Sequence, residues 1–349
     1  MTEMVTTRNT SASSCTTNTQ DIYLGIDSGN GRLKALSSNG YSVRIPSLLY
    51  FPHSEISVGE LDNESSYIVY EGGSRSDLWG KQFLVGREAY VMAPDFHIST
   101  SDDKEAKAKY CLELLLGAVA QVVNEGKVNL TVAVSIHDRA AFKESLITNL
   151  QGTHRVRLNH KSCEVVVDVK AVVDEGVGAY YEMVKIKRIQ KFETALFLDT
   201  GHGTIITSVF GSGELKYRKA YYLGVSKLYD AIANNLQMRK ALKGIPGNPE
   251  LIKQGIEAGN FIYGNNSKLS FNFRDIYKAE LSPWVDDSLV KVLASLSQWQ
   301  NEATHLFCIG GGVQLPGIKN YLEKRAFDCL QDSEWLNARG LLKIAQRNK

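Results

Sequence analysis

The sequence predicts an α/β fold built from two related halves, and three segments carry the prediction. Residues 23–35 read as an apolar strand that ends in Asp27, a turn with two glycines and a second strand. Residues 197–210 repeat this arrangement around Asp199, which lies 172 residues further along the chain (199 − 27). Residues 305–318 read as a strand, three consecutive glycines and a helix. The repeated aspartate and glycine turn suggests a duplicated fold that grips one phosphate chain from two sides.

The residue types in these segments favour a nucleotide as the ligand. Glycines let the backbone turn without a Cβ clash, so that its N–H groups can approach an anion closely. A carboxylate at a strand end can hold Mg²⁺ through water, because this ion keeps several waters and takes one or two carboxylates. A single aspartate–glycine turn is ordinary hairpin chemistry. In a strand, triple glycine and helix, as in residues 305–318, the backbone can lie flat against a nucleotide.

The first half is expected to contain a mixed sheet. Residues 1–20 consist largely of Thr, Ser, Asn and Gln and predict a disordered tail, so that order begins at Asp21. The expected elements are strands at 21–27, 32–37 and 41–46, an exposed excursion at 52–80 with a short strand at 67–70, a helix that starts at 99–103 and ends at Gly126, a strand at 130–135, a helix through Leu150 and two strands within 155–173. Their order is β-β-β-α-β-α-β.

The second half is expected to be richer in helices. Its expected elements are a helix near 176–187, the strand pair around Asp199, a hairpin to Tyr217, a helix that opens at Gly224, a connection rich in Lys, Gly and Pro at 240–249, a further helix, a long helical stretch at 274–302, a strand at 305–309, a helix after Gly312 and a last helix from Glu334.

Composition narrows the class of protein. Apolar residues make up 43% and charged residues 22%, which is ordinary for a soluble globular protein. The net charge of +2 gives no reason to expect nucleic acid as a direct partner. The five cysteines are scattered without a CxxC pair, which favours reduced thiols and a cytoplasmic protein. No apolar run approaches the roughly 20 residues of a membrane span, and the N-terminus lacks the apolar core of a signal peptide.

The three segments, in this order, resemble the first phosphate loop, the second phosphate loop and the adenosine motif of the actin-like ATPases. A fourth segment, Val172–Tyr180, resembles the helix that connects the two halves of the actin fold. The resemblance implies two ribonuclease-H-like domains with the nucleotide in the cleft between them. Domain I would comprise residues 21–174 and 331–349, and domain II residues 175–330.

The resemblance also implies roles for individual residues. Asp27 and Asp199 would hold Mg²⁺ through its waters, and Glu175 would orient the attacking water, with the adjacent Asp174 as the alternative. The residues that would bind ATP are Ser28, Gly29, Asn30 and Lys34 on one side of the phosphates, Thr200, Gly201, Gly203 and Thr204 on the other, and Gly310, Gly311 and Gly312 against the adenosine. His202 could touch phosphate or project into solvent, and we expect solvent.

Three further stretches resemble the ParM-type actins that segregate bacterial plasmids: residues 223–232, 309–322 and 333–345. The Gly-Val-Gly-Ala run at 176–179 is also shared with archaeal actin-like proteins. The resemblance implies an ATPase that polymerises into filaments and moves DNA through a separate DNA-binding adaptor of the ParR type, without sequence-specific DNA binding of its own. A small-molecule kinase or a regulatory ATPase of the same superfamily is the alternative, although no insertion stands out that would build an acceptor pocket.

Overall fold

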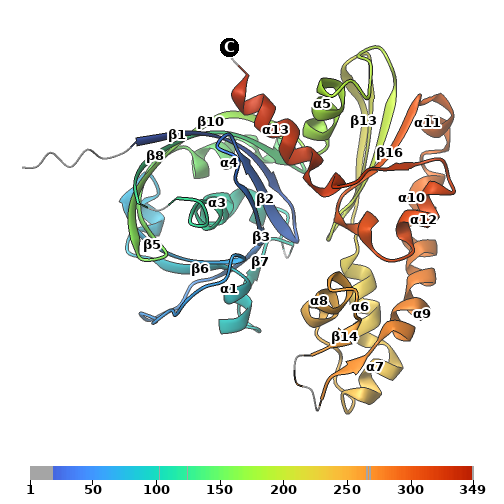
Figure 1. The fold of residues 1–349 in the computed structure, drawn as a ribbon, viewed down its shortest axis with the longest axis horizontal. Coiled ribbons are helices and arrows are strands. Elements are labelled where there is room, and N and C mark those ends of the chain that lie inside the picture. The colour runs from blue at the N-terminus through green and yellow to red at the C-terminus, as the bar shows by residue number, and fades with distance from the viewer. Residues whose placement is uncertain (1–18, 102, 124, 265, 267–268, 348–349) are drawn as a thin grey trace, which may run out of the picture.

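The computed structural model describes residues 19–347 except for 102, 124, 265, 267 and 268. The predicted tail lies outside this range apart from its last two residues, which open strand β1 (Thr19–Ser28). The chain forms α-helices and β-strands in two parts, each with its own sheet and hydrophobic core, so the predicted α/β class is confirmed (Figure 1).

The first part is a ten-stranded sheet in the order β3-β2-β1-β8-β10-β9-β5-β6-β4-β7. Its strands after β1 are β2 (Arg32–Ser37), β3 (Ser42–Pro46), β4 (Leu48–Tyr50), β5 (Ser65–Gly73), β6 (Gln82–Gly86), β7 (Ile98–Ser99), β8 (Gly126–Ile136), β9 (Gly152–Leu158) and β10 (Lys161–Asp174). Strand β8 runs parallel to both β1 and β10, and the other pairings are antiparallel. The sheet is therefore mixed, as predicted.

This sheet curls around helix α3 (Cys111–Val119), which Figure 1 shows at its centre. All nine residues of α3 are buried, and most of them are apolar. A helix that is apolar on every side needs cover on every side, and the curled sheet supplies it. The helices α1 (Arg87–Met92), α2 (Ala106–Lys109) and α4 (Arg139–Leu150) complete this part of the chain.

The second part has a five-stranded sheet in the order β13-β12-β11-β16-β17. Its strands are β11 (Ala195–Thr200), β12 (Ile205–Gly211), β13 (Glu214–Tyr221), β16 (His305–Ile309) and β17 (Asp328–Cys329). Its helices are α5 (Val177–Lys185), α6 (Ser226–Asn234), α7 (Leu236–Ala241), α8 (Pro249–Glu257), α9 (Arg274–Trp284), α10 (Lys291–Ala294), α11 (Ser297–Glu302) and α12 (Ile318–Glu323), with a small hairpin of β14 (Ile262–Tyr263) and β15 (Phe271–Asn272).

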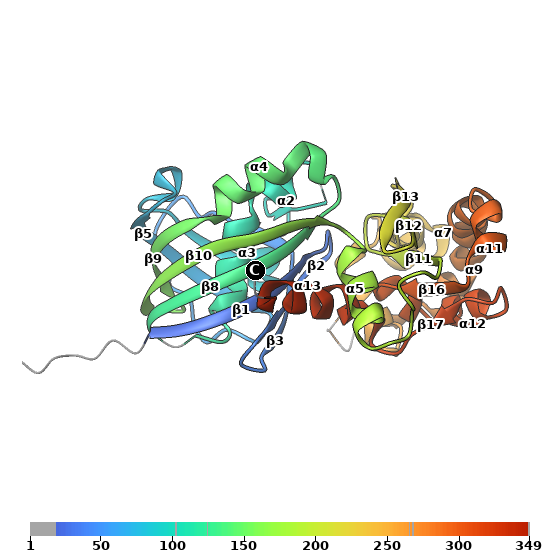
Figure 2. The same ribbon diagram turned by 90° about the horizontal axis from the view of Figure 1, so that it is seen from above.

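The last helix, α13 (Leu336–Gln346), joins the two parts. It lies against β1 and β8 of the first sheet and against α5 (Figures 1 and 2). Glycines make the close contact possible: a Cβ on Gly25 would lie 2.2 Å from the backbone N of Leu342, and one on Gly340 would lie 1.8 Å from the carbonyl oxygen of Gly178. The C-terminal helix is thus packed backbone to backbone on both sides.

Three predicted segments differ from the structure. Residues 65–73 form the long, largely buried strand β5, because they pair with both β6 and β9, whereas we expected only a short strand at 67–70 within an exposed excursion. The single helix expected from 99–103 to Gly126 is replaced by two shorter helices, α2 and α3, the second of which ends at Val119. The helix expected over 274–302 contains a π-helical turn at Val285–Val290, which begins two residues after Pro283, a residue without the N–H that a regular helix uses.

No helix among the described residues has the length and apolar character needed to cross a membrane.

Candidate functional site

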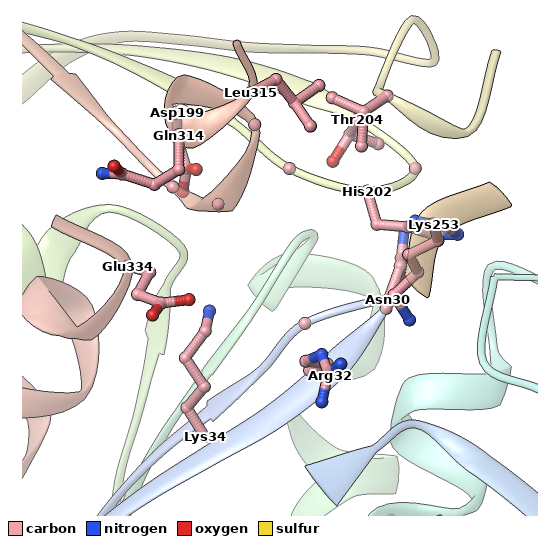
Figure 3. Close-up of a pocket in the computed structure, with 18 of the residues that line it drawn as sticks. Asn30, Arg32, Lys34, Asp199, His202, Thr204, Lys253, Gln314, Leu315 and Glu334 are labelled. Carbon is pink, nitrogen blue, oxygen red and sulfur yellow. The ribbon is translucent and has the colours of Figure 1, made fainter. Parts of the chain in front are cut away.

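A cavity of about 490 Å³ lies between the two parts of the chain, and the predicted loops form its walls. Figure 3 shows Asn30, Arg32 and Lys34 on one wall, facing Asp199 and Thr204 on the other. The predicted residues that line the cavity are Asp27, Gly29, Asn30, Lys34, Glu175, Asp199, Gly201, Gly203, Thr204, Gly310, Gly311 and Gly312. Its volume is in the usual range for ligand sites, roughly 300–1,000 Å³.

Asp27 stands at the end of β1, where the antiparallel register pairs it with Lys34 of β2. The Lys34 ammonium is 3.4 Å from Oδ2 of Asp27. The other oxygen, Oδ1, accepts hydrogen bonds from Nδ2 of Asn337 at 2.9 Å and from Oγ of Ser135 at 3.4 Å. The Asp27 side chain is therefore oriented by three elements, β2, β8 and α13.

Asp199 stands at the corresponding end of β11, next to β16 in parallel register. Burial first, and then repulsion by the Asp27 carboxylate, raise the pKa of Asp199 from 3.8 to about 7, while Lys34 acts in the opposite direction. A buried carboxylate whose charge is disfavoured by a neighbouring carboxylate marks a site where a cation would be stabilised.

The glycine loops approach these carboxylates more closely than any side chain would allow. A Cβ on Gly310 would lie 2.3 Å from Oδ1 of Asp199, and φ at Gly310 is +89°, which also favours glycine. A Cβ on Gly203 would lie 2.6 Å from Nδ2 of Asn30 on the opposite loop. The two aspartate–glycine loops thus approach each other closely, and residues 310–312 close the same cavity from a third side.

Glu175 lies at the junction of the two parts, directly after β10, and its side chain is only 8% exposed. Its Oε1 accepts a hydrogen bond of 2.5 Å from the Lys107 ammonium, which is equally buried. The alternative, Asp174, does not line this cavity and pairs with Arg139 at 3.3 Å. The geometry thus favours Glu175 for a role in the cavity.

His202 does not project into solvent, contrary to our expectation. It lines the cavity, and a Cβ on Gly31 would lie 2.8 Å from its own Cβ. Its ring centre is 5.9 Å from that of Tyr229. Burial lowers the pKa of His202 to about 4, helped by the positive charges of Lys253 and Arg32. A neutral imidazole therefore fills the gap between the two phosphate loops.

Ser28 and Thr200 are the two predicted site residues that do not line the cavity. Both are buried beneath their loops, and neither hydroxyl has a hydrogen-bond partner among the described residues. The structure also adds residues that sequence reasoning missed: Arg32, Arg44, Lys107, Tyr229, Lys253, Glu257, Gln314 and Glu334 line the cavity, and Asn337 lies behind it. Most of these are charged, and their positions depend on long-range packing.

Arg32 bridges the two parts across this cavity. Its Nη1 is 2.6 Å from Oε1 of Glu64 in the first part, and its Nη2 is 2.9 Å from Oε2 of Glu257 at the end of α8 in the second. On the same side of the cleft, Nδ2 of Asn248 donates a hydrogen bond to the hydroxyl of Tyr90. These contacts hold α8 against the first part.

Comparison with known proteins agrees with this geometry. Residues 25–178 match the family of actin-like proteins, N-terminal domain. No curated protein sequence matches the chain. Among solved structures, the archaeal actin homologue Ta0583 has a TM-score of 0.74 at 15% identity, covering 94% of this chain and 100% of its own. A pCBH ParM mutant has a TM-score of 0.70 at 17% identity, covering 94% and 99%. Bacillus thuringiensis ParM with ATP has a TM-score of 0.62 at 19% identity, covering 94% and 98%.

These matches confirm the actin-like α/β fold and the resemblance to the actin-like ATPase superfamily. The chain is similar in structure to ParM proteins and to archaeal actin homologues. Several of the similar structures contain a nucleotide: Bacillus thuringiensis ParM is known with ATP and with AMPPNP, and Ta0583 with ADP.

Proposed function

We propose that this chain is an ATP-binding and ATP-hydrolysing actin-like protein that polymerises into filaments and serves plasmid DNA segregation in the cytoplasm. One observation carries the proposal. The two aspartate turns, around Asp27 and Asp199, face each other across a cavity that the glycines at 310–312 also line. This is the arrangement expected for a triphosphate held from both sides, with its base on the third loop.

The residues present fit Mg²⁺ and ATP. The raised pKa of Asp199, which is buried beside Asp27, indicates a place where a bound cation would stabilise the ionised carboxylate. Asp27 and Asp199 would hold Mg²⁺ through its waters, and the ion would supply positive charge against the phosphates. Lys34 and the glycine loops line the cavity, where Lys34 would face the phosphates as a point charge and the loops would offer backbone N–H groups.

Glu175 is the proposed residue that orients the attacking water. Phosphoryl transfer depends mainly on positioning and electrostatics, so one well-placed acceptor can govern the rate. The Lys107 hydrogen bond occupies Oε1, and no described side chain donates a hydrogen bond to Oε2. This second oxygen can therefore accept a proton of the water.

The proposed domain division follows the sheets. The ten-stranded sheet uses residues 19–174, and α13 returns from the second part to pack against it. This supports domain I at 21–174 and 331–349, and domain II at 175–330. The 490 Å³ cavity is then the cleft between the domains.

The proposed partners are further copies of this chain and a DNA-binding adaptor of the ParR type. Support comes from the similarity to ParM proteins, one of which is described as a non-polymerisable mutant. The net charge of +2 fits a protein that leaves DNA binding to an adaptor.

Turnover of Mg-ATP without any added acceptor, together with sedimentation and electron microscopy, tests the proposal. We expect the parent to release phosphate and to pellet as filaments, and Asp199→Ala to lose turnover. Asp168→Ala is the matched control, because Asp168 is an exposed aspartate on β10 that does not line the cavity. Unchanged hydrolysis by Asp199→Ala would contradict the proposed site, and the absence of polymer under all nucleotide conditions would contradict the filament function.

A second cavity of about 580 Å³ keeps the kinase alternative open. It adjoins the phosphate loops and is lined by Asn30, His202, Gly203 and Thr204 on that side. Sequence analysis gave no sign of an acceptor pocket, because the cavity forms between distant segments and not within an insertion. A small hydroxyl compound in this space could receive the terminal phosphate. Turnover that requires such an acceptor, with no polymer formed, would favour the kinase.

A further inference from the structure

We propose that Lys107 is a positioning residue for ATP hydrolysis that acts by fixing the carboxylate of Glu175. The inference rests on the function proposed above. Lys107 belongs to the short helix α2, whereas Glu175 follows β10, so the pair joins two segments 68 residues apart. Their side chains are 4% and 8% exposed, and the distance from Nζ to Oε1 is 2.5 Å. Such a buried charge-assisted hydrogen bond fixes both groups firmly.

The pair lies at the phosphate end of the nucleotide cavity. Lys107 lines both this cavity and the second one, as do Asn30 and Gly203 of the two phosphate loops. The glycines at 310–312, which are proposed to contact adenosine, line only the first cavity. Lys107 and Glu175 are therefore placed where the terminal phosphate and the attacking water would meet.

The geometry leaves one carboxylate oxygen of Glu175 for water. Lys107 binds Oε1, while the second nearby cation, Nη2 of Arg218, is 3.9 Å from Oε2, which is too far for a hydrogen bond. Arg218 instead donates to two backbone oxygens, those of Glu175 at 3.3 Å and His137 at 2.6 Å. Lys107 thus sets the direction in which Oε2 points, and Arg218 supports the backbone behind it.

A purely structural ion pair is the competing explanation, and the chain contains one for comparison. Lys343 of α13 lies 2.6 Å from Glu182 of α5, whose side chain is also 8% exposed. Neither residue lines the cavity. Lys343→Met therefore breaks a similar contact to a buried glutamate without touching the site, and it serves as the matched control for Lys107→Met.

The test measures ATP affinity by calorimetry and steady-state phosphate release for the parent, Lys107→Met, Lys107→Arg and Lys343→Met. If Lys107 positions Glu175, Lys107→Met should lose about 10²-fold in kcat, the usual loss for one electrostatic group in an active site. ATP affinity should change by less than about threefold, because binding rests on the loops. Lys107→Arg should recover part of the turnover, and Lys343→Met should match the parent.

A double variant keeps the test decisive if Lys107→Met folds poorly. Lys107→Met with Glu175→Gln removes both buried charges together, which avoids an unpaired carboxylate. Because the two residues are proposed to act as a unit, this variant should be no slower than Glu175→Gln alone. Parental turnover in Lys107→Met, equal losses of affinity and kcat, or multiplicative losses in the double variant would overturn the inference. Absence of turnover in the parent would instead overturn the proposed function, and this inference with it.

Discussion

Replacement of Asp199 by asparagine should stabilise the nucleotide-free protein while abolishing its Mg²⁺-dependent turnover. The folded protein raises the pKa of Asp199 from 3.8 to about 7, mainly through burial and then through the charge of Asp27. Each pKa unit corresponds to about 1.4 kcal/mol, so ionised Asp199 lowers the free energy of unfolding by at most about 4 kcal/mol. Water in the cavity screens the charge and reduces this figure toward about 1 kcal/mol. Asparagine has nearly the same shape and carries no charge.

The pH dependence of stability fixes the sign of the expected difference between the variant and the parent. Between pH 3.8 and about 7 the folded state binds more protons at Asp199 than the unfolded state does. The contribution of this residue to stability therefore falls as the pH rises through that window and becomes constant above it. The difference in melting temperature between Asp199→Asn and the parent should be small near pH 4. By pH 8 it should reach about 1 to 6 °C in favour of the variant.

Thermal unfolding of both proteins from pH 4 to pH 8, with Asp168→Asn as the control, measures this directly. Adding Mg-ATP should raise the melting temperature of the parent more than that of Asp199→Asn, and a chelator should reverse the gain. A melting temperature for Asp199→Asn equal to or below that of the parent at pH 8 would refute the electrostatic reasoning. So would a difference that does not change with pH.

Three other outcomes are expected. Glu175→Ala should bind ATP with parental affinity but hydrolyse it about 10²-fold more slowly, and its filaments should persist longer in sedimentation assays. Asp174→Ala alters a residue outside the cavity, so it should neither slow hydrolysis nor prolong the filaments. Glu257→Gln should speed release of a fluorescent nucleotide about two- to fivefold, because it breaks the bridge from Arg32 across the cleft. Glu64→Gln weakens contacts to Arg32 and Arg44 that lie within the first part, so an equal effect of this variant would exclude the bridge as the cause. With a net charge of +2, the purified protein should bind DNA weakly near physiological salt. It should co-sediment with plasmid DNA only when the adaptor and ATP are present. Tight, sequence-specific DNA binding by the chain alone would contradict this expectation.

The parts of the site that could be predicted are those encoded locally. Asp27 and Asp199 end apolar strands and precede glycine turns, and both turns reach the cavity. The same holds for the glycines at 310–312, whose strand β16 lies beside β11 in parallel register. A strand end followed by glycines fixes both the position of a carboxylate and the course of the loop, so neighbouring residues suffice for the prediction.

The parts that could not be predicted depend on contacts between distant residues. Asn337 hydrogen-bonds to Asp27 from 310 residues away, and nothing near Asn337 in the sequence marks it as a site residue. Lys107 lies in a run of charged residues that reads as the exposed side of a helix, yet it is buried against Glu175. His202 stands in a polar glycine turn, and its position against the opposite loop depends on Gly31, where a Cβ would lie 2.8 Å from the Cβ of His202.

Helix α13 connects the two groups of residues on which the proposed chemistry depends. Asn337, in its first turn, donates a hydrogen bond to Asp27 and another to Ser135 of β8. The same residue packs on α5, since a Cβ on Gly178 would lie 2.4 Å from its carbonyl oxygen, and Gly178 is only three residues beyond Glu175. The orientation of Asp27 and the start of the segment that carries Glu175 therefore share one rigid support. The loop around Asp199 belongs to the other sheet and faces Asp27 and Glu175 across the cavity. A change in the angle between the two parts would thus move Asp199 relative to Asp27 and Glu175 together, which makes cation binding and water orientation depend on closure of the same cleft.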